Sequence, residues 1–315
     1  MFKKVIVTGS LAYDHIMTMP GYFRDHIMSE KLHILNISFI MNTFRQEFGG
    51  TGGNIAWTLG FLKTPTTLVA AAGDDFGSYE KHLNKRSIDL SGVKVFKNVH
   101  TARGFVTTDG DDNQIWGFYE GAMKNSRTLS LKKLLKEDVI VMIAPNDPQA
   151  MIKYVNEAIG SAKPYVFDPA FNIPHFETKD LKKAIKKSEI LIGNDYEIEL
   201  IQEKLRLTKK EVFKLARIVV TTLGAKGSRI ETSASSFEIP SAKPKNETDP
   251  TGAGDAYRAG FLAGYVRGLK LDVCGKMGAV AAVYTVEKYG TQTHRFTTRD
   301  FISRYKQNYG DEFRI

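Results

Sequence analysis

A glycine-rich turn in the last third of this chain leads without a break into a helix. The turn is Asp249-Pro250-Thr251-Gly252-Ala253-Gly254-Asp255, and residues 256–266 after it have the spacing of a helix with one apolar face. The free N–H groups of a helix's first turn, together with the helix dipole, attract anions. Glycine lets the backbone approach a ligand closely. The sequence therefore predicts an anion-binding turn at the start of a helix.

Asp255 falls in the first turn of this helix, where the dipole favours an ionised carboxylate. A carboxylate held beside a phosphate-binding turn is what phosphoryl transfer requires to accept the proton of a hydroxyl group. The alternative is an aspartate that only caps a helix after a glycine turn. A second aspartate, a proline and a pair of glycines occur together here, and this combination favours a catalytic Asp255.

The composition narrows the class of protein. The 315 residues are enough to bury a sizeable core, either as one large domain with a smaller appendage or as two domains. Lys and Arg together number 44 against 35 for Asp and Glu, but no zinc-finger spacing, aromatic RNA-binding motif or long basic run accompanies the excess. Nucleic-acid binding is therefore not expected, and a solvated surface that attracts anionic nucleotides accounts for the charge.

Cysteine content and hydropathy point to a location. The single cysteine, Cys274, rules out an internal disulfide and fits a reducing compartment. The apolar run in residues 1–7 is too short for a signal peptide, and no apolar segment reaches membrane-spanning length. We therefore expect a cytoplasmic protein without membrane contact.

A second glycine-rich loop lies about two hundred residues upstream. Gly49-Gly50-Thr51-Gly52-Gly53-Asn54 precedes a helix expected over 54–62. Glycine-rich loops before helices often hold anions, but this one is neither a Walker sequence nor a complete dinucleotide fingerprint. On physical grounds alone its signal is weak.

The two loops resemble the two signatures of the ribokinase-like (PfkB) family of sugar and nucleoside kinases. Residues 249–255 are similar to the C-terminal signature, and residues 49–56, with Gly73-Asp74-Asp75-Phe76-Gly77 after them, are similar to the N-terminal one. Lys63 departs from the pattern, since the family usually has a small residue there. The resemblance spans nearly the whole chain and is nearest to the prokaryotic adenosine and nucleoside kinases. It implies an α/β fold, a ribokinase-like three-layer sandwich with a mostly parallel central sheet and a small β-sheet lid.

The order of elements supports the same fold class. After residue 125, strands and helices alternate, which predicts βαβ units and a mostly parallel sheet covered on both faces. The expected strands are 139–143, 165–168, 190–193 and 218–222, the expected helices are 148–159, 179–187 and 195–203, and an antiparallel pair is expected around 233–239.

Two segments interrupt this alternation. Residues 33–40 have the pattern of an extended segment, and residues 102–108 and 114–119 flank a strong hairpin turn. We expect residues 15–48 and 101–122 to form a β lid over the substrate, which is also a candidate surface for a homodimer. Residues 1–14, 49–100 and 123–315 would then form the core domain with the nucleotide and catalytic sites.

Several residues are expected to bind the acceptor substrate. Asp14 follows a first strand expected over 5–7, at the end where open α/β sheets bind ligands. The resemblance implies that Asp14, the Gly49-Gly50 backbone and the Asn54 amide hold substrate hydroxyls; a plain turn aspartate is the alternative for Asp14. The aromatic side chains of the expected lid offer flat faces on which a nucleoside base could stack. Alternatively, they pack between the lid and the core domain or across a dimer contact. We predict that at least one of Phe39, Phe105, Trp116 and Phe118 contacts the base, and Phe105, Trp116 and Phe118 are the main candidates.

A nucleotide and magnesium site is expected at two later loops. Asn194 and Glu197 match the family's Asn-x-x-Glu pattern, which implies that they organise Mg²⁺ and phosphates, often through water. They also form a sound helix start, an asparagine cap with glutamate at the third position. The stretch with Thr222, Gly224, Lys226 and Gly227 resembles the family's nucleotide loop, although Lys226 could equally be a solvated surface residue.

The last helical segment gives a weaker signal. Residues 277–284 read as a helix of small and apolar side chains. Small residues such as Ala279 and Ala282 would leave room for a purine beside the nucleotide, or they are ordinary helix packing. Gly290 is expected to end this helix as a glycine C-cap.

Together, these expected site residues indicate a phosphoryl-transfer reaction. Asp255 would deprotonate the acceptor hydroxyl, and the N–H groups of Gly252, Ala253 and Gly254 would stabilise the moving phosphoryl group. Arg258, three residues further along the same helix face, would either grip that group or pair with an acidic neighbour. We expect an ATP- and Mg²⁺-dependent kinase that phosphorylates the 5'-hydroxyl of a nucleoside, adenosine first. A sugar kinase of the ribokinase or fructokinase type is the alternative, and a non-catalytic ligand sensor on the same fold is a third.

Overall fold

The computed structural model describes residues 2–28, 33–34, 36–136 and 138–310. Within them, continuous runs of β-branched and apolar residues form the middle of a large sheet, as is usual for parallel strands buried on both faces. The sheet has nine strands in the order β13-β12-β11-β10-β9-β8-β1-β4-β5. Its strands are β1 (Lys4–Thr8), β4 (Thr66–Ala72), β5 (Asp89–Val95), β8 (Val139–Ile143), β9 (Tyr165–Phe167), β10 (Ile190–Asn194), β11 (Ile218–Thr222), β12 (Ser228–Thr232) and β13 (Ser236–Ile239).

The sheet is mostly parallel. Neighbouring strands from β5 to β11 run in the same direction, and β12 and β13 add an antiparallel edge. The parallel strands therefore all end at one edge of the sheet. Thr8, Asn194 and Thr222 are the last residues of three of them, so the loops that follow lie at the edge where open α/β sheets bind ligands.

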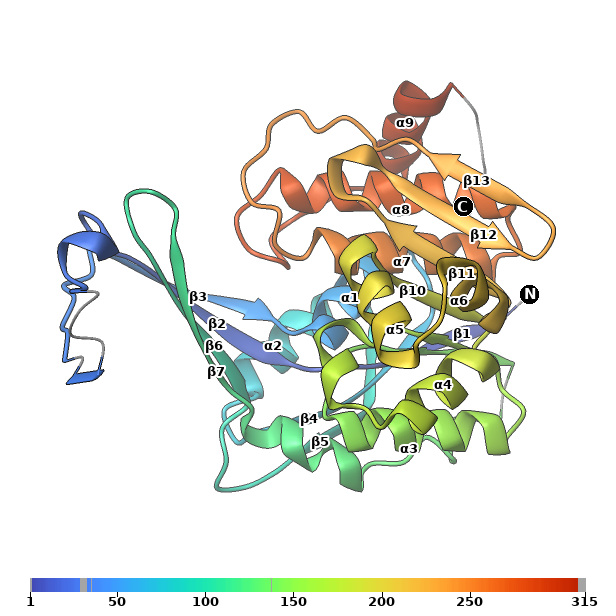
Figure 1. Cartoon of the computed structure of the whole chain (residues 1–315), viewed down its shortest axis with the longest axis horizontal. Coiled ribbons are helices and arrows are strands. Elements are labelled where there is room, and N and C mark those ends of the chain that lie inside the picture. Colours follow the sequence, from blue (N-terminus) through green and yellow to red (C-terminus); the bar gives the residue numbers. More distant parts are fainter. Residues whose placement is uncertain (1, 29–32, 35, 137, 311–315) are drawn as a thin grey trace.

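Helices cover both faces of this sheet (Figure 1). Alternate strand residues point to opposite faces, so Val5 and Val7 join one apolar cluster and Ile6 joins the other. The first cluster includes side chains from α1 (Thr51–Phe61), α2 (Gly77–Leu83), α7 (Ala253–Val266), α8 (Leu271–Val286) and α9 (Thr298–Tyr309). The second includes side chains from α3 (Pro148–Gly160), α4 (Thr178–Lys187), α5 (Asp195–Leu205) and α6 (Lys209–Leu215).

A second, four-stranded sheet extends away from this body (Figure 1). Its order is β3-β2-β6-β7, formed by β2 (Ala12–Thr18), β3 (Thr43–Gly49), β6 (Ala102–Thr108) and β7 (Gln114–Tyr119). We call it the small sheet. Strand β2 pairs in parallel with β6, and the other two pairs are antiparallel.

The register of the small sheet decides which side chains share a face. Asp14 lies opposite Glu47 on one side and Gly104 on the other, and Gly104 lies opposite Phe118. Since directly paired residues point to the same side, Asp14, Glu47 and Phe118 share one face. Trp116 joins them, because it is two residues from Phe118 on the same strand.

The expected fold class is confirmed: the chain is an α/β three-layer sandwich with a mostly parallel central sheet and a second, smaller sheet. The strands expected at 139–143 and 218–222 coincide with β8 and β11, and those expected at 102–108 and 114–119 coincide with β6 and β7. None of the helices in the described part of the chain combines the length and apolarity that a membrane crossing requires.

Three expectations about local structure are wrong. Residues 33–34 and 36–40, the described part of the segment expected to be extended, form no strand; β3 lies later, at Thr43–Gly49, where exposed polar side chains hide the strand pattern. Asp14 does not end the first strand, because it lies within β2 of the small sheet. The segment 277–284 belongs to α8, which ends at Val286 rather than at Gly290. The division of the chain into a core and a substrate lid stays a prediction.

Candidate active site

The site is built around the start of α7. Gly252 precedes the helix with φ of 79°, a left-handed conformation that favours glycine. A Cβ atom on Gly252 would lie 2.8 Å from the Thr291 Cγ2 atom, so a larger residue would also collide. Asp255 follows in the first helical turn, half-buried, and its Oδ2 accepts a hydrogen bond of 2.8 Å from Asn54 Nδ2. The two glycine-rich loops, about two hundred residues apart in sequence, therefore meet at the catalytic candidate.

The aspartate that opens the loop fixes its shape. The Asp249 carboxylate accepts hydrogen bonds from the N–H of Thr251, at 2.9 Å, and from the N–H of Gly290, at 3.1 Å. Gly290 therefore has a role in this loop rather than in capping α8. The N–H of Ala253 donates to Pro250 O within the turn, at 3.1 Å. The Ala253 N–H would have to break this hydrogen bond to donate to a phosphoryl oxygen.

Asp14 reaches the same site from the small sheet. Cβ atoms on Gly49 and Gly104 would lie 2.0 and 2.7 Å from the Asp14 carboxylate oxygens, so only glycines leave room for this carboxylate. Burial, then the nearby Asp255 and Glu47 carboxylates, raise the pKa of Asp14 to about 6. The site thus holds Asp14 and Asp255 close enough to repel each other, which favours a ligand that donates hydrogen bonds between them.

Burial also raises the pKa of Asp255 above the ordinary aspartate value. The Arg258 guanidinium and the hydrogen bond from Asn54 act in the opposite direction, and Glu197 adds to the rise. A carboxylate with a raised pKa is a stronger base while it stays ionised, which suits proton transfer from a hydroxyl.

Arg258 is engaged by an acidic neighbour. Its Nη2 donates to Asp168 Oδ1 at 2.9 Å, its Nε lies 2.5 Å from Asp168 Oδ2, and Glu197 Oε2 lies 3.8 Å from Nη2. Both Arg258 and Asp168 are buried. Of the two roles expected for Arg258, the structure contains the pairing with an acid; the contact with a phosphoryl group stays a prediction. A Cβ atom on Gly254 would lie 2.8 Å from Arg258 Nη1, so the guanidinium lies directly against the loop.

Asp168 and Glu47 did not appear among the expected site residues. Asp168 directly follows β9, and ligands bind at the carboxyl ends of the strands of open α/β sheets, so its position in the sequence could have identified it as a site residue. Glu47 lies on an exposed polar strand, and its place opposite Asp14 depends on the register of the small sheet, which the sequence does not reveal.

Asn194 and Glu197 form a complete capping box at the start of α5. Asn194 Oδ1 accepts from the Glu197 N–H, and Glu197 Oε2 accepts from the Asn194 N–H, each at 2.7 Å. Glu197 also lies close to Arg258, and burial and Asp168 raise its pKa. These oxygens are already engaged by the protein. The donor set therefore fits Mg²⁺ held through its own water molecules, since this ion usually keeps several of them.

The loop after β11, which is expected to bind the nucleotide, lies at the same edge of the large sheet. Thr222 ends β11, Gly224 and Gly227 have φ of 59° and 94°, and Lys226 between them is exposed. A Cβ atom on Gly227 would lie 2.0 Å from Ile239 O, so this position requires glycine. On α8, Ala279 is buried in the apolar core and Ala282 is partly buried against it, which favours packing as the role of Ala279.

The lid aromatics divide between the two faces of the small sheet. Trp116 and Phe118 are each about half exposed, on the face that carries Asp14. Phe105 lies opposite His15, and their rings stack at 4.9 Å on the other face. The register thus turns the Phe105 ring away from Asp14, which favours Trp116 and Phe118 over Phe105 as base contacts. Phe39 packs edge to face on Phe23, at 5.5 Å.

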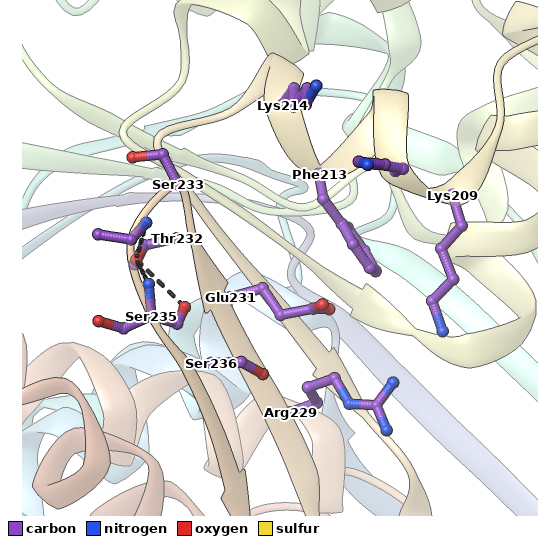
Figure 2. A pocket seen from close by; sticks show the side chains of 11 residues that line it. Lys209, Phe213, Lys214, Arg229, Glu231, Thr232, Ser233, Ser235 and Ser236 are labelled. Carbon is purple, nitrogen blue, oxygen red and sulfur yellow. Dashed lines mark hydrogen bonds between the residues drawn. The ribbon is translucent and has the colours of Figure 1, made fainter.

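A basic hollow lies elsewhere on the molecule (Figure 2). It has a volume of about 670 Å³ and is lined by Lys209, Lys210, Phe213, Lys214, Arg229, Glu231 and residues 232–236. Thr232 pairs with Ile218, the first residue of β11, whereas Ser228 pairs with Thr222, the last. The hollow therefore lies at the opposite end of the strands from the nucleotide loop and is separate from the site around Asp255.

Known proteins share both the sequence and the fold of this chain. A family model described as pfkB family carbohydrate kinase matches residues 4–298. A curated nucleoside kinase of Methanocaldococcus jannaschii is 32% identical over 308 residues, which cover 97% of this chain and 98% of that protein.

Solved structures agree with the family match. The nucleoside kinase of Burkholderia thailandensis in complex with inosine superposes with a TM-score of 0.88 at 29% identity and covers 98% of this chain and 99% of that one. The same enzyme in complex with ADP-inosine gives a TM-score of 0.86 at 30% identity, with 98% and 97% coverage. The ribokinase of Thermotoga maritima, 20% identical, shares the fold with a TM-score of 0.82 over 97% of this chain and 100% of that one. With its ribokinase-like fold, the chain thus belongs to the PfkB family of carbohydrate kinases, enzymes that transfer a phosphoryl group to an alcohol acceptor.

Proposed function

We propose that this protein is a nucleoside kinase that transfers the γ-phosphoryl group of ATP to the 5'-hydroxyl of a purine nucleoside, adenosine first. The observation that carries the proposal is the placement of Trp116 and Phe118 on the same face of the small sheet as Asp14. Asp14 in turn lies close enough to Asp255 for the Asp255 carboxylate to raise the pKa of Asp14. A flat base and a ribose with free hydroxyls match these two kinds of surface. The similar nucleoside kinases, one of them bound to inosine, support the same acceptor class.

The proposed chemistry uses the groups around α7. Asp255 accepts the proton of the 5'-hydroxyl as the hydroxyl oxygen attacks the γ-phosphorus of ATP, and the bond from that phosphorus to the bridging oxygen breaks to release ADP. Asp14 holds the ribose hydroxyls in place. The loop at Gly252 and Gly254 approaches the moving phosphoryl group, which the start of the helix stabilises electrostatically. Mg²⁺, held through water by Glu197, would neutralise charge on the phosphates of ATP. Positioning and charge neutralisation are the main requirements of phosphoryl transfer.

Product analysis tests this proposal. The protein is incubated with Mg-ATP and adenosine, and the product is examined by phosphorus NMR with coupling to the ribose protons. The proposal expects a phosphomonoester whose phosphorus couples to the two 5' protons. A phosphate on the 2' or 3' oxygen, or transfer to free ribose but to no nucleoside, would refute it.

The two faces of the small sheet offer a matched pair of variants. Phe118→Ala is expected to weaken nucleoside use by about 1–3 kcal/mol, the scale of stacking between a base and an aromatic ring. Phe105→Ala removes the same ring from the neighbouring strand on the opposite face, and it should leave nucleoside use nearly unchanged. The measurement is kcat/KM for adenosine, with ribose as an acceptor that has no base. Equal losses in the two variants would show that these rings only support the lid.

Asp14 gives a prediction for acceptor binding and for its pH dependence. Asp14→Asn is expected to weaken acceptor binding by about 1.5–3 kcal/mol, the scale of a hydrogen bond to a charged group. The free energy of ATP binding should stay within a few tenths of a kcal/mol of the wild-type value. The pKa of Asp14 is about 6, so the carboxylate is ionised above that pH and protonated below it. Acceptor kcat/KM should therefore rise with pH through about 6 in the wild type and lose this step in the variant. Equal weakening of both ligands would assign Asp14 to the structure of the turn.

The homodimer expected through the lid also stays a prediction. Phe44, Phe105 and Ile115 are exposed on the face of the small sheet away from Asp14, where a second copy could pack. Sedimentation velocity over a range of concentrations measures this directly. The cytoplasmic location is likewise a prediction from the sequence.

A further inference from the structure

The turn after α8 packs into the centre of the site. Residues 287–292 follow the end of α8 at Val286, and Gly290 has φ of 81°, which reverses the chain. This reversal directs Thr291 and Gln292 inward, where both side chains are buried, 5% and 3% exposed. Polar side chains this deeply buried need hydrogen-bond partners, and their partners identify what the turn does.

The first partner is the carboxamide of Asn54. The Thr291 hydroxyl lies 2.8 Å from Asn54 Oδ1, and Gln292 Nε2 donates to the same oxygen at 2.9 Å. Gln292 Nε2 is fixed as a donor, because the Tyr79 hydroxyl that it also contacts gives its own proton to Gly49 O. The amide of Asn54 therefore has one orientation, since a rotation by 180° would place its own N–H groups against Gln292 Nε2, and the Thr291 hydroxyl adds a donor when its proton points to Asn54. Nδ2 must then point the other way, and there it donates to Asp255 Oδ2 at 2.8 Å.

The second set of partners reaches the acceptor side of the site. Gln292 Nε2 also donates to the Tyr79 hydroxyl, which donates to Gly49 O at 2.6 Å. The Thr291 hydroxyl also lies 2.9 Å from Phe48 O, so its single proton is shared between this oxygen and Asn54 Oδ1. The Thr291 methyl group packs against Gly252. One short turn therefore touches the loop before Asp255, the amide that contacts Asp255, and the end of β3 beside Asp14.

We propose that Thr291 and Gln292 are positioning residues for the catalytic base: they fix the orientation of the Asn54 amide so that it donates to Asp255 and keeps that carboxylate ionised and aimed at the acceptor. This inference rests on the proposed role of Asp255. A hydrogen bond to the charged form of an acid favours that form, so loss of the Asn54 contact should raise the pKa of Asp255.

The test measures the ionisation of Asp255 without relying on turnover. Aspartate labelled with ¹³C at the side-chain carboxyl is incorporated into the full chain, and the Asp255 resonance is identified by its absence in Asp255→Asn. Gln292→Leu and Thr291→Val each remove one donor to Asn54. Thr291→Ser keeps the hydroxyl and should behave as wild type. Thr285→Val removes a buried hydroxyl of α8 that bonds to His294, and serves as the matched control for lost stability.

We expect the Asp255 titration to move upward by about one pH unit in Gln292→Leu and Thr291→Val, and to stay in place in Thr291→Ser and Thr285→Val. The kcat of the first two variants should fall roughly five- to tenfold, because the carboxylate is no longer held toward the acceptor, and the acidic limb of the kcat pH profile should move upward with the titration. The KM for ATP should not change. The other charged or titratable groups that face Asp255 are unchanged in all four variants, so they cannot cause the shift: Asp14, Tyr79, Asp168, Glu197 and Arg258.

An Asp255 titration that is the same in all variants would overturn the proposal, and the turn would then only pack the core. A shift of equal size in Thr285→Val would do the same. Failure of the proposed nucleoside activity is a separate result, because the titration needs no acceptor and still decides whether the turn controls Asp255.

Discussion

Replacing Asp255 with asparagine is expected to lower turnover by about two to four powers of ten while the protein stays folded. The amide has nearly the shape of the carboxylate, and its oxygen can still accept the hydrogen bond from Asn54 Nδ2. What it cannot do is take the proton of the acceptor hydroxyl. The measurement is kcat with saturating Mg-ATP and acceptor, beside a thermal melt that checks the fold.

A matched control separates base catalysis from helix capping. Asp300 is a first-turn aspartate of α9, where its carboxylate accepts from the Thr297 N–H at 2.9 Å. Asp300→Asn removes a charge at an equivalent helix position far from the site in sequence and should leave kcat unchanged. If Asp255→Asn keeps turnover within about threefold of wild type, Asp255 is not the base.

Replacing Arg258 with methionine is expected to destabilise the fold by about 3–5 kcal/mol, because it leaves buried carboxylates without their cation. Asp168 loses an ion pair and a hydrogen bond, and Glu197 loses the charge at 3.8 Å. The free energy of unfolding is measured in denaturant. Arg217→Met is the control, since its ion pair with Glu189 is largely exposed on the arginine side and such pairs contribute about 0–1 kcal/mol.

The loss of folding stability in Arg258→Met should depend on pH in a defined direction. Burial raises the pKa of Asp168 and of Glu197 in the native protein, and removing Arg258 raises both further. Acids with folded pKa values above their unfolded ones contribute stability at low pH and lose it as pH rises through the folded pKa. The deficit of Arg258→Met should therefore be smaller at acidic than at neutral pH. A deficit that is small, or the same at every pH, would contradict a buried ion-pair cluster.

Much of the fold could be predicted, because its signals are local. The strands β8 and β11 are short apolar runs, VIVMI and IVVTT, and their limits coincide with the expected ones. The turn between β6 and β7 has its own sequence signature, so that hairpin was also placed correctly. Strand β3 was not found, because Thr43–Gly49 is polar and partly exposed on both faces, and the period that reveals a strand is absent.

The site was less predictable, because it depends on contacts between distant segments. The two glycine-rich loops, and Asp255 within the second of them, can be recognised from a short stretch of sequence. The pairing of Arg258 with Asp168 joins residues 90 positions apart, and the contacts of Asn54 with Thr291 and Gln292 span more than 230. Nothing local distinguishes Thr291 and Gln292 from an ordinary turn. The side of the sheet to which Phe105 points follows from strand register, which needs the paired strand as well.

A coupled ADP-release assay with Mg-ATP over adenosine, guanosine, inosine, cytidine, ribose and fructose decides which acceptor this kinase prefers. Comparison of kcat/KM places these acceptors on one scale. We expect a purine nucleoside to give the highest value, with adenosine first, and ribose and fructose to fall well below it. A preference for ribose over every nucleoside, or no ADP release with any acceptor, would contradict the proposed nucleoside kinase activity.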